Sequence, residues 1–335
     1  VGSEMCIRDS HGVKAHVTVN IMPRNDEIAR LPQWLEYINE VGVTAAIMAD
    51  VGVLSLCKKY APNVECHIST QASIVNYASA NAWYDLGAQR VVLARELNLE
   101  EIRTIRQKVD PKLEIETFGH GAMCVSYSGR CLLSNYMTGR DSNRGACAQF
   151  CRMPFSLVDA DGREVEHDRY LLSLKDLNQS DHLLELAEAG ATSFKIEGRL
   201  KDISYVKNVT AAYNQQLNRI VSRYPDKYCR SSLGVCSYTF TPDLRKTFNR
   251  GYTTYFLHGR QPDIASFDTP KAMGEFVGTV KELRADSFNV AGVSSFANGD
   301  GLCFYHGHQL EGFRANRVVG NRIYPCLLYT SPSPR

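Results

Sequence analysis

The chain has 335 residues, of which 44% are hydrophobic and 22% are charged. This composition is typical of a folded globular protein with room for a large core and a second domain, and it excludes a disordered or membrane-spanning chain. The formal net charge of +2 excludes an overall basic field, so a nucleic-acid partner would have to contact a local patch.

The two ends of the chain do not match the periodicity beside them. Residues 1–10 (VGSEMCIRDS) and 326–335 (CLLYTSPSPR) resemble translated sequencing-adapter sequence, and we expect both to be artefacts. Setting them aside removes Cys6 and Cys326 and leaves nine cysteines, an odd number that favours a reducing compartment over a disulfide scaffold. We therefore expect a cytoplasmic protein that does not contact a membrane.

From residue 11 onward, short β-rich runs alternate with helical ones. The predicted strands are 14–20, 44–49, 64–69, 90–94, 112–118, 171–174 and 193–197. The predicted helices include 28–42, one opened by Asn98, one at 182–190 and one capped by Asp202, with a hairpin that turns at Asp161-Gly162 between them. Strands separated by helices of about 10–15 residues predict repeated βα units and a parallel sheet.

Six or seven βα units before Val221 predict an α/β fold, a TIM-like (β/α)8 barrel over residues 11–221 that is truncated at its N-terminus. A doubly wound open sheet is the alternative, although no G-x-G-x-x-G follows any strand. After a linker at 222–234, runs rich in Val, Phe, Tyr and Thr and broken by Gly and Asn predict a small antiparallel β-barrel-like domain over 235–325.

Four cysteines follow the predicted strand 112–118 with the spacing C-x6-C-x15-C-x3-C: Cys124, Cys131, Cys147 and Cys151. Thiolates bind soft metals, and four of them are what an iron–sulfur cluster or a closed zinc site requires. Zinc ligands usually come in C-x2–4-C pairs, which fits only the second pair, so we favour a [4Fe–4S] cluster. Zinc, disulfides and buried thiols without a ligand remain the alternatives.

Polar residues at the ends of the predicted strands are candidate site residues, because chemistry in parallel barrels takes place at the carboxyl ends of the strands. We expect catalytic roles for Glu116, His120, Lys195, Glu197 and Arg199, and substrate binding by His67, Gln71, Arg95, Arg140 and Arg144. Each has a structural alternative: an ion-pair ladder for the 195–199 residues, a turn cap for Glu116, a core position for His67 and balance of thiolate charge for the loop arginines.

Several motifs resemble those of the peptidase U32 family. The signature region of that family matches Glu116-Thr-Phe118-Gly-His120-Gly121-Ala-Met-Cys124 and Gly129-Arg-Cys131-Leu-Leu-Ser134, and the segments HISTQ (67–71) and FKIEGRLKDISYVKNV (194–209) match it as well. The resemblance extends from about residue 11 to 325. The tail, with FNRGYTTYFLHGR and SFDTPKAMGEFVGTV, is most similar to a branch associated with hydroxylation of 23S ribosomal RNA and also described as collagenase-like proteases.

The resemblance implies a barrel with a [4Fe–4S] cluster on Cys124, Cys131, Cys147 and Cys151. It also implies an RNA substrate, rRNA or tRNA, prephenate as a co-substrate, and an electron donor that the sequence does not identify. Arginines and lysines at the barrel mouth would suit that dicarboxylate. For RNA contact we expect Lys201, Lys207, Arg219 and the β domain.

The predicted function is therefore iron–sulfur-dependent hydroxylation of RNA. A collagenase-like U32 peptidase is the first alternative, although the sequence has no H-E-x-x-H or H-x-x-E-H motif and no G-x-S-x-G elbow. A non-catalytic RNA-binding module is the second.

Overall fold

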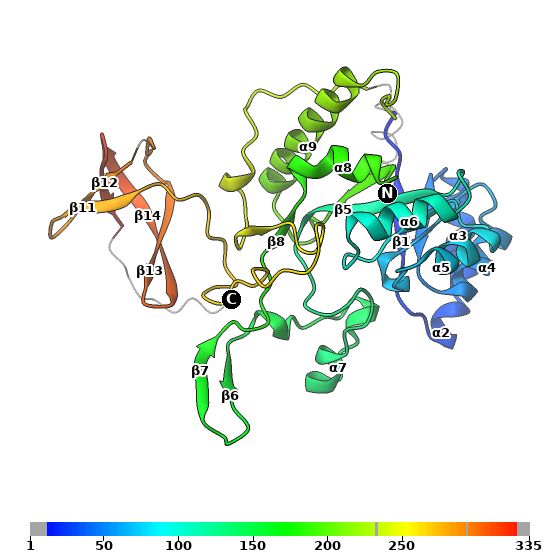
Figure 1. The fold of residues 1–335 in the computed structure, drawn as a ribbon, viewed down its shortest axis with the longest axis horizontal. Coiled ribbons are helices and arrows are strands. Elements are labelled where there is room, and N and C mark those ends of the chain that lie inside the picture. The colour runs from blue at the N-terminus through cyan, green and yellow to red at the C-terminus, as the bar shows by residue number, and fades with distance from the viewer. Residues whose placement is uncertain (1–11, 232–233, 293, 327–335) are drawn as a thin grey trace.

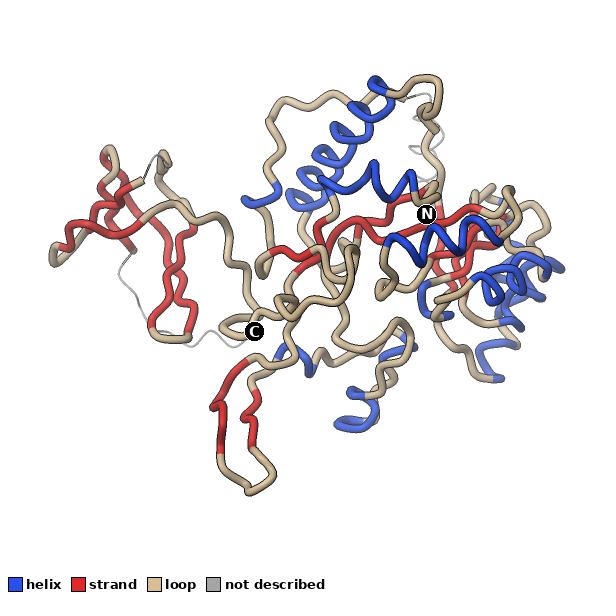
Figure 2. The backbone as a smooth tube through the Cα atoms, viewed as in Figure 1, coloured by secondary structure: helices blue, strands red, loops and turns tan. Residues whose placement is uncertain are grey.

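The computed structural model describes residues 12–231, 234–292 and 294–326, and the predicted terminal artefacts lie outside these ranges except for Cys326. Figure 1 shows an α/β unit with helices packed beside its sheet, a separate antiparallel sheet built from the C-terminal strands, and a projecting hairpin. Figure 2 shows that long loops join these parts. In the described residues no helix is long and apolar enough to cross a membrane.

Six parallel strands form the centre of the α/β unit. They pair in the order β1 (His16–Val19), β2 (Ala45–Met48), β3 (Glu65–Ile68), β4 (Arg90–Val92), β5 (Glu114–Gly121) and β9 (Ser193–Ile196). The helices between them are α2 (Asn25–Ile28), α3 (Leu31–Glu40), α4 (Val51–Tyr60), α5 (Tyr77–Asp85), α6 (Leu99–Lys108) and α8 (Leu183–Glu188), and α9 (Ile203–Arg223) follows β9. The predicted mixed α/β fold with a parallel sheet is confirmed.

Local signals explain where the helices begin. Asp50, Asn98 and Asp202 each accept a hydrogen bond from a backbone N–H in the first turn of α4, α6 and α9, which satisfies a donor that has no partner inside the helix. The expected caps at Asn98 and Asp202 are thus confirmed. At Asn98 the cap is reciprocal, because Glu101 accepts from the Asn98 N–H at 2.8 Å.

The two faces of the parallel sheet differ in chemistry. One face contributes Met48, Ile68, Val91 and Ile115 to an apolar core with the helices. The other face carries polar groups, among them Glu116 and His67. Because side chains alternate along a strand, one set of residues packs against the helices while the other set can line a site.

The sheet departs from the predicted barrel after β5. The strand predicted at 171–174 is instead β8 (Asp176–Asn178), which pairs antiparallel with the end of β5 and parallel with β10 (Tyr252–Thr253). Among the described strands β1 pairs with β2 alone, so the sheet is open at that edge. A closed TIM-like barrel therefore stays a prediction.

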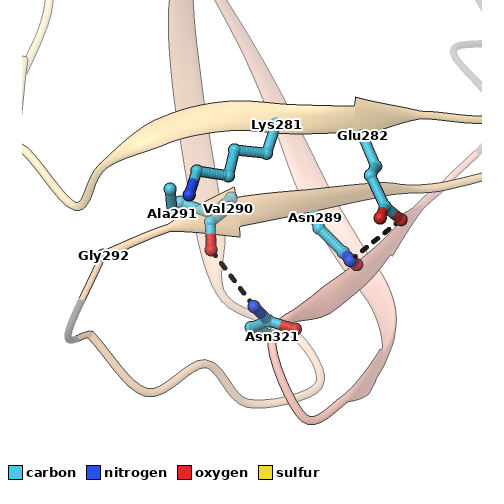
Figure 3. Close-up of a pocket in the computed structure, with 7 residues that line it drawn as sticks. All are labelled: Lys281, Glu282, Asn289, Val290, Ala291, Gly292 and Asn321. Carbon is cyan, nitrogen blue, oxygen red and sulfur yellow. Dashed lines mark hydrogen bonds between the residues drawn. The ribbon is translucent and has the colours of Figure 1, made fainter.

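The antiparallel unit is a five-stranded sheet in the order β11 (Thr279–Leu283), β12 (Phe288–Ala291), β15 (Arg322–Pro325), β14 (Gln309–Val319) and β13 (Gly301–His306). Its core is small, with Val290, Ala315 and Ile323 buried. A shallow pocket of about 490 Å³ lies on this sheet beside Lys281 and Asn321 (Figure 3). The predicted hairpin is also present, as β6 (Phe155–Val158) and β7 (Glu164–Arg169).

The antiparallel sheet begins later than the predicted domain start at residue 235. The β-rich runs between 236 and 257 do not join it, because β10 pairs with β8 and the turn after β10 packs on the α/β unit. A buried ion pair between Arg250 Nη1 and Asp176 Oδ1, at 2.9 Å, fixes this segment there. Residues 243–274 are therefore part of the first unit in their contacts.

Candidate functional site

The cysteine segment leaves the carboxyl end of β5 and folds into a loop with a short helix, α7 (Leu133–Thr138), and two 3-10 turns, η2 (Ser142–Arg144) and η3 (Phe150–Arg152). Gly129 has a φ of +72°, and a β-carbon there would clash with the Gln71 carbonyl. The loop thus packs closely on the segment after β3.

An arginine at the end of the loop joins its two ends. Arg152 donates to the Met123 carbonyl at 2.8 Å and to the Leu174 carbonyl at 2.6 Å. Met123 precedes the first cysteine of the loop and Arg152 follows the last, so one guanidinium holds both ends of the segment together.

A pocket of about 750 Å³ lies between this loop and the carboxyl ends of the parallel strands. It is lined by the four loop cysteines, by Phe118 and Lys195 within β5 and β9, and by residues that follow β1, β3, β4 and β9, which include Asn20, Ser69, Gln71, Arg95, Glu197 and Arg199. The structure therefore brings together all four predicted metal ligands and five of the other ten predicted site residues.

The cysteines differ in environment. Burial raises the pKa of the Cys124 and Cys151 thiols, and neighbouring cysteines raise it further. Cys147 is exposed, and its Sγ accepts a hydrogen bond from the Gln149 backbone N–H at an N–S distance of 3.4 Å. Within the described part of the chain, no three of these sulfurs lie within 4.8 Å of one another, whereas sulfurs on one tetrahedral zinc ion lie about 3.8 Å apart.

Cationic and polar groups face the cysteines across the pocket. Arg95 is half-buried, its guanidinium lies 4.0 Å from the centre of the Phe118 ring, and its buried Nε has no hydrogen-bond partner. The buried Oε1 of Gln71 has no partner either. Burial lowers the pKa of Arg95, while the nearby Cys124 and Glu197 oppose that shift. A buried donor and a buried acceptor without partners are the kind of groups that a ligand would satisfy.

Lys195, Glu197 and Arg199 also line the pocket, but they do not form one ion-pair ladder. Lys195 Nζ lies 3.8 Å from Glu116 Oε1. Glu197 Oε1 accepts from the Arg199 backbone N–H at 2.8 Å, and the Arg199 guanidinium reaches the Gly145 carbonyl at 3.4 Å. These contacts tie the end of β9 to the cysteine loop.

Glu116 and His67 lie one layer deeper, away from the pocket lining. Glu116 Oε2 accepts from Arg90 at 3.1 Å and from the Ser193 hydroxyl at 2.7 Å. His67 Nε2 lies 3.0 Å from Glu65 Oε2, and burial beside Arg90 lowers the pKa of His67 to about 3. Both residues are therefore parts of a buried polar network, which fits the structural alternative for His67.

His120 does not face the pocket. A register shift between Phe118 and His120 in β5 reverses the expected alternation, and the imidazole packs against the Tyr205, Tyr213 and Tyr252 rings. His120 Nδ1 lies 3.2 Å from the Tyr213 hydroxyl, and burial lowers the pKa of His120 to about 4. The structure gives no contact between this predicted catalytic residue and the pocket.

Two predicted anion-binding arginines are placed elsewhere. Arg144 makes a bidentate ion pair with Glu27, with both N–O distances at 2.8 Å, and it does not line the pocket. This pairing lowers the pKa of Glu27 to about 2. Arg140 is exposed beside α7 and is absent from the described lining. Arg144 thus anchors the cysteine loop to α2.

The pocket also includes residues to which the sequence analysis assigned no role. Asn20 donates to the Ser69 hydroxyl at 3.2 Å, and both follow strands, so their positions were a usable signal. Trp34 and Phe150 line the pocket from α3 and η3, and no local pattern marks them.

A match to a protein-family model assigns the chain. The model of peptidase family U32 matches residues 4–266. The chain belongs to this family. Its predicted resemblance to U32 proteins is therefore confirmed.

Three curated relatives of the chain differ in the activities that their names give. The chain is 44% identical to the 23S rRNA 5-hydroxycytidine C2501 synthase of Escherichia coli, over 92% of the chain and 46% of that protein. It is 37% identical to tRNA hydroxylation protein P1 of Bacillus subtilis, over 90% of the chain and 72% of that protein. It is 34% identical to a collagenase of Porphyromonas gingivalis, over 77% and 62%. The chain thus spans about half the length of the Escherichia coli relative.

Proposed function

We propose that this U32 chain is part of an enzyme that hydroxylates RNA, with a [4Fe–4S] cluster held by Cys124, Cys131, Cys147 and Cys151. The observation that carries the proposal is that one pocket, at the carboxyl ends of the parallel strands, is lined by all four cysteines together with Arg95 and Lys195. The rRNA and tRNA hydroxylation proteins among the relatives support an RNA substrate.

The environment of the thiols fits an iron–sulfur cluster. The Gln149 N–H and the Ser134 hydroxyl approach the Cys147 sulfur at 3.4 Å and 3.8 Å, and such donors tune cluster potentials. Arg95 and Arg152 are close enough to Cys124 for their charges to interact with it, which would offset the negative charge of thiolates in a buried site. A bound cluster supplies single-electron transfer and, with an open coordination site, polarises an oxygen ligand.

The residues opposite the cysteines would bind the second substrate. Arg95 Nε and Gln71 Oε1 are buried without partners, so together they offer a donor and an acceptor to one polar ligand. Lys195 adds a second cation on the same pocket wall. A dicarboxylate of the prephenate type suits two cations and an amide, because each carboxylate gains a charge-assisted hydrogen bond.

RNA would reach this pocket across the surface around it. Lys207 and Arg219 are exposed on α9, whereas Lys201 is half-buried with its Nζ over the Phe248 ring. We therefore expect Lys207 and Arg219, more than Lys201, to contact phosphates, with affinity that falls as salt rises.

We also propose that the parallel sheet is the larger part of a TIM-like barrel. Successive helices pack against one another, α3 with α4, α5 with α6, and α6 with α8, as they do when all lie on the outer face of a barrel. The polar inner face and the pocket at the carboxyl ends of the strands agree with that arrangement.

Peptidase activity is the second candidate, favoured by the Porphyromonas gingivalis collagenase among the relatives. A cysteine peptidase needs a thiolate nucleophile, yet burial raises the pKa of Cys124 and Cys151. Cluster binding also needs thiolates, but there iron replaces the protons of all four thiols, whereas a peptidase would need one of them as a free thiolate.

The decisive experiment is anaerobic purification followed by iron and sulfide analysis, with visible absorption, of the full chain, Cys131→Ala and Cys229→Ala. We expect about four iron and four sulfide per chain in the parent and in Cys229→Ala, where the exposed thiol lies outside the pocket, and loss of both in Cys131→Ala.

Activity is then measured on the same preparations. Hydroxylation of undermodified rRNA or tRNA should require the four cysteines when prephenate, dioxygen and a reductant are supplied, so that one oxygen atom enters the RNA and the other is reduced to water. The product is read by mass spectrometry of digested nucleosides. A colourless, iron-free chain after reconstitution, or gelatin cleavage unchanged in Cys131→Ala, would refute the redox proposal and favour the peptidase.

A further inference from the structure

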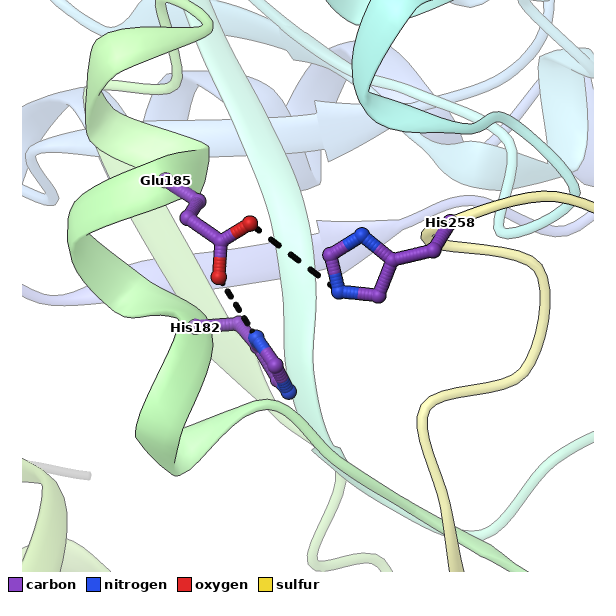
Figure 4. A group of neighbouring side chains, drawn as sticks. All are labelled: His182, Glu185 and His258. Carbon is purple, nitrogen blue, oxygen red and sulfur yellow. Dashed lines mark hydrogen bonds and ion pairs between the residues drawn. The ribbon is translucent and has the colours of Figure 1, made fainter.

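A second group of metal-ligating side chains lies outside the cysteine pocket. His182 ends the 3-10 turn η4 (Ser180–His182), Glu185 is in the first turn of α8, and His258 lies on the turn after β10. One ligand atom from each residue lies within 4.8 Å of the other two. Figure 4 shows one oxygen of the Glu185 carboxylate joined to each imidazole, with His258 reaching over from a different segment.

The contacts within this group already join the three residues. His182 Nδ1 lies 2.7 Å from Glu185 Oε1, and His258 Nε2 lies 3.9 Å from Glu185 Oε2. The two imidazole rings meet edge to face, with centroids 4.9 Å apart. The two oxygens of Glu185 thus face one imidazole each.

The backbone holds both sides of the group in place without a ligand. The Gln179 side chain donates to the Thr254 carbonyl at 2.9 Å, which joins the segment before His182 to the segment before His258. Leu183 and Leu257, the neighbours of the two histidines, are buried. In addition, Leu99 N–H donates to the Leu257 carbonyl at 3.0 Å. The site is therefore preorganised on rigid segments.

We propose that His182, Glu185 and His258 bind one divalent transition-metal ion of the zinc type. Two imidazoles and a carboxylate, with water in a fourth position, are a ligand set that zinc accepts, at about 2.0–2.1 Å to nitrogen. Ligand atoms on one such ion lie about 3.4 Å apart, so the present spacing requires side-chain shifts of about an ångström. The half-exposed His258 leaves a route for the ion and a place for water.

The ion would connect α8 to the turn that carries Tyr255 and Phe256. Those two side chains pack against Phe118, which lines the cysteine pocket. Metal binding would therefore stabilise a wall of that pocket from outside. The inference does not depend on the proposed RNA hydroxylation.

The test is calorimetric titration of Zn²⁺ into the metal-stripped full chain with the cysteine thiols blocked by alkylation, together with Co²⁺ absorption spectra. We expect one site and a rise in melting temperature on binding, with a cobalt spectrum that has d–d bands and no thiolate charge-transfer band. His258→Ala and Glu185→Gln should each weaken binding by at least about tenfold.

The matched control is His167→Ala. His167 also lies 2.8 Å from a glutamate three residues away, Glu164, but within the described ranges no second histidine completes a group there. This variant should bind Zn²⁺ like the parent. The proposal would be overturned if the alkylated parent did not bind Zn²⁺. It would also be overturned if His258→Ala bound Zn²⁺ as tightly as the parent while the two metal-free proteins had the same melting temperature.

Discussion

Replacing Arg250 by Met tests whether the buried ion pair with Asp176 fixes residues 243–274 to the α/β unit. The Arg250 and Asp176 side chains are 8% and 3% exposed. Arg250 Nη1 donates to Asp176 Oδ1 at 2.9 Å, and Arg250 Nε donates to the Pro270 carbonyl at 2.9 Å. The substitution removes both bonds and leaves a buried carboxylate without its cation.

Loss of one partner of a buried ion pair costs about 3–5 kcal/mol. We expect the lower end, about 3 kcal/mol, because Arg152 and Lys201 are close enough for their charges to interact with Asp176. With a denaturant dependence of about 3 kcal/mol per molar urea, the midpoint of unfolding should fall by about 1 M.

The assay is urea unfolding followed by tryptophan fluorescence. Both tryptophans of the chain, Trp34 and Trp83, lie on helices of the α/β unit, so the signal reports that unit. Arg245→Met is the control, because it removes an exposed arginine from the same segment, and its midpoint should not change.

A double-mutant cycle sharpens the result. Asp176→Asn combined with Arg250→Met should be less destabilised than the sum of the single variants by at least about 1 kcal/mol, because the unpaired charge is removed with its partner. A midpoint for Arg250→Met within about 0.3 M of the Arg245→Met control would refute the inferred role of this ion pair.

Two further predictions concern protonation. Arg144 lowers the pKa of Glu27 to about 2, so the ion pair contributes fully to stability above about pH 4.5 and this contribution is lost as pH falls from about 4.5 toward 2. Carboxyl NMR of Arg144→Met should find Glu27 near its ordinary pKa. An unchanged titration would contradict the pairing. His67 and His120 have pKa values lowered by burial to about 3 and 4, so their contribution to stability is complete above about 6.5 and declines as pH falls from about 6.5 toward these values. Imidazole NMR should find both neutral at pH 5.5, and titration of either near 6.5 in the folded chain would refute their burial.

The strands of the α/β unit could be predicted because their signals are local. Apolar β-rich runs such as 44–49 and 64–69 alternate with helices whose first turns are capped by residues such as Asn98. The meeting of the cysteines with Lys195 and Glu197 could also be predicted, since parallel strands place their carboxyl ends at one edge of a sheet.

The rest depends on contacts that no local pattern records. The direction of His120 follows from an irregularity in β5, and the role of Arg144 follows from a carboxylate 117 residues away. Likewise, the aromatic run near Tyr252 is typical of an antiparallel strand, yet it pairs in parallel with β8 because the Asp176–Arg250 pair holds it there. In each case the orientation or role of the residue depends on a partner that is distant in the sequence.

The hydrogen bonds of Arg152 make the stability of the sheet nearly independent of the length of the cysteine loop. Because one guanidinium brings residues 123 and 152 together, the chain between them is a closed excursion whose ends are already held by the fold. For such an excursion, doubling the number of residues adds only about 0.6 kcal/mol of closure entropy. Insertions between Cys131 and Cys147 would thus cost the sheet little stability.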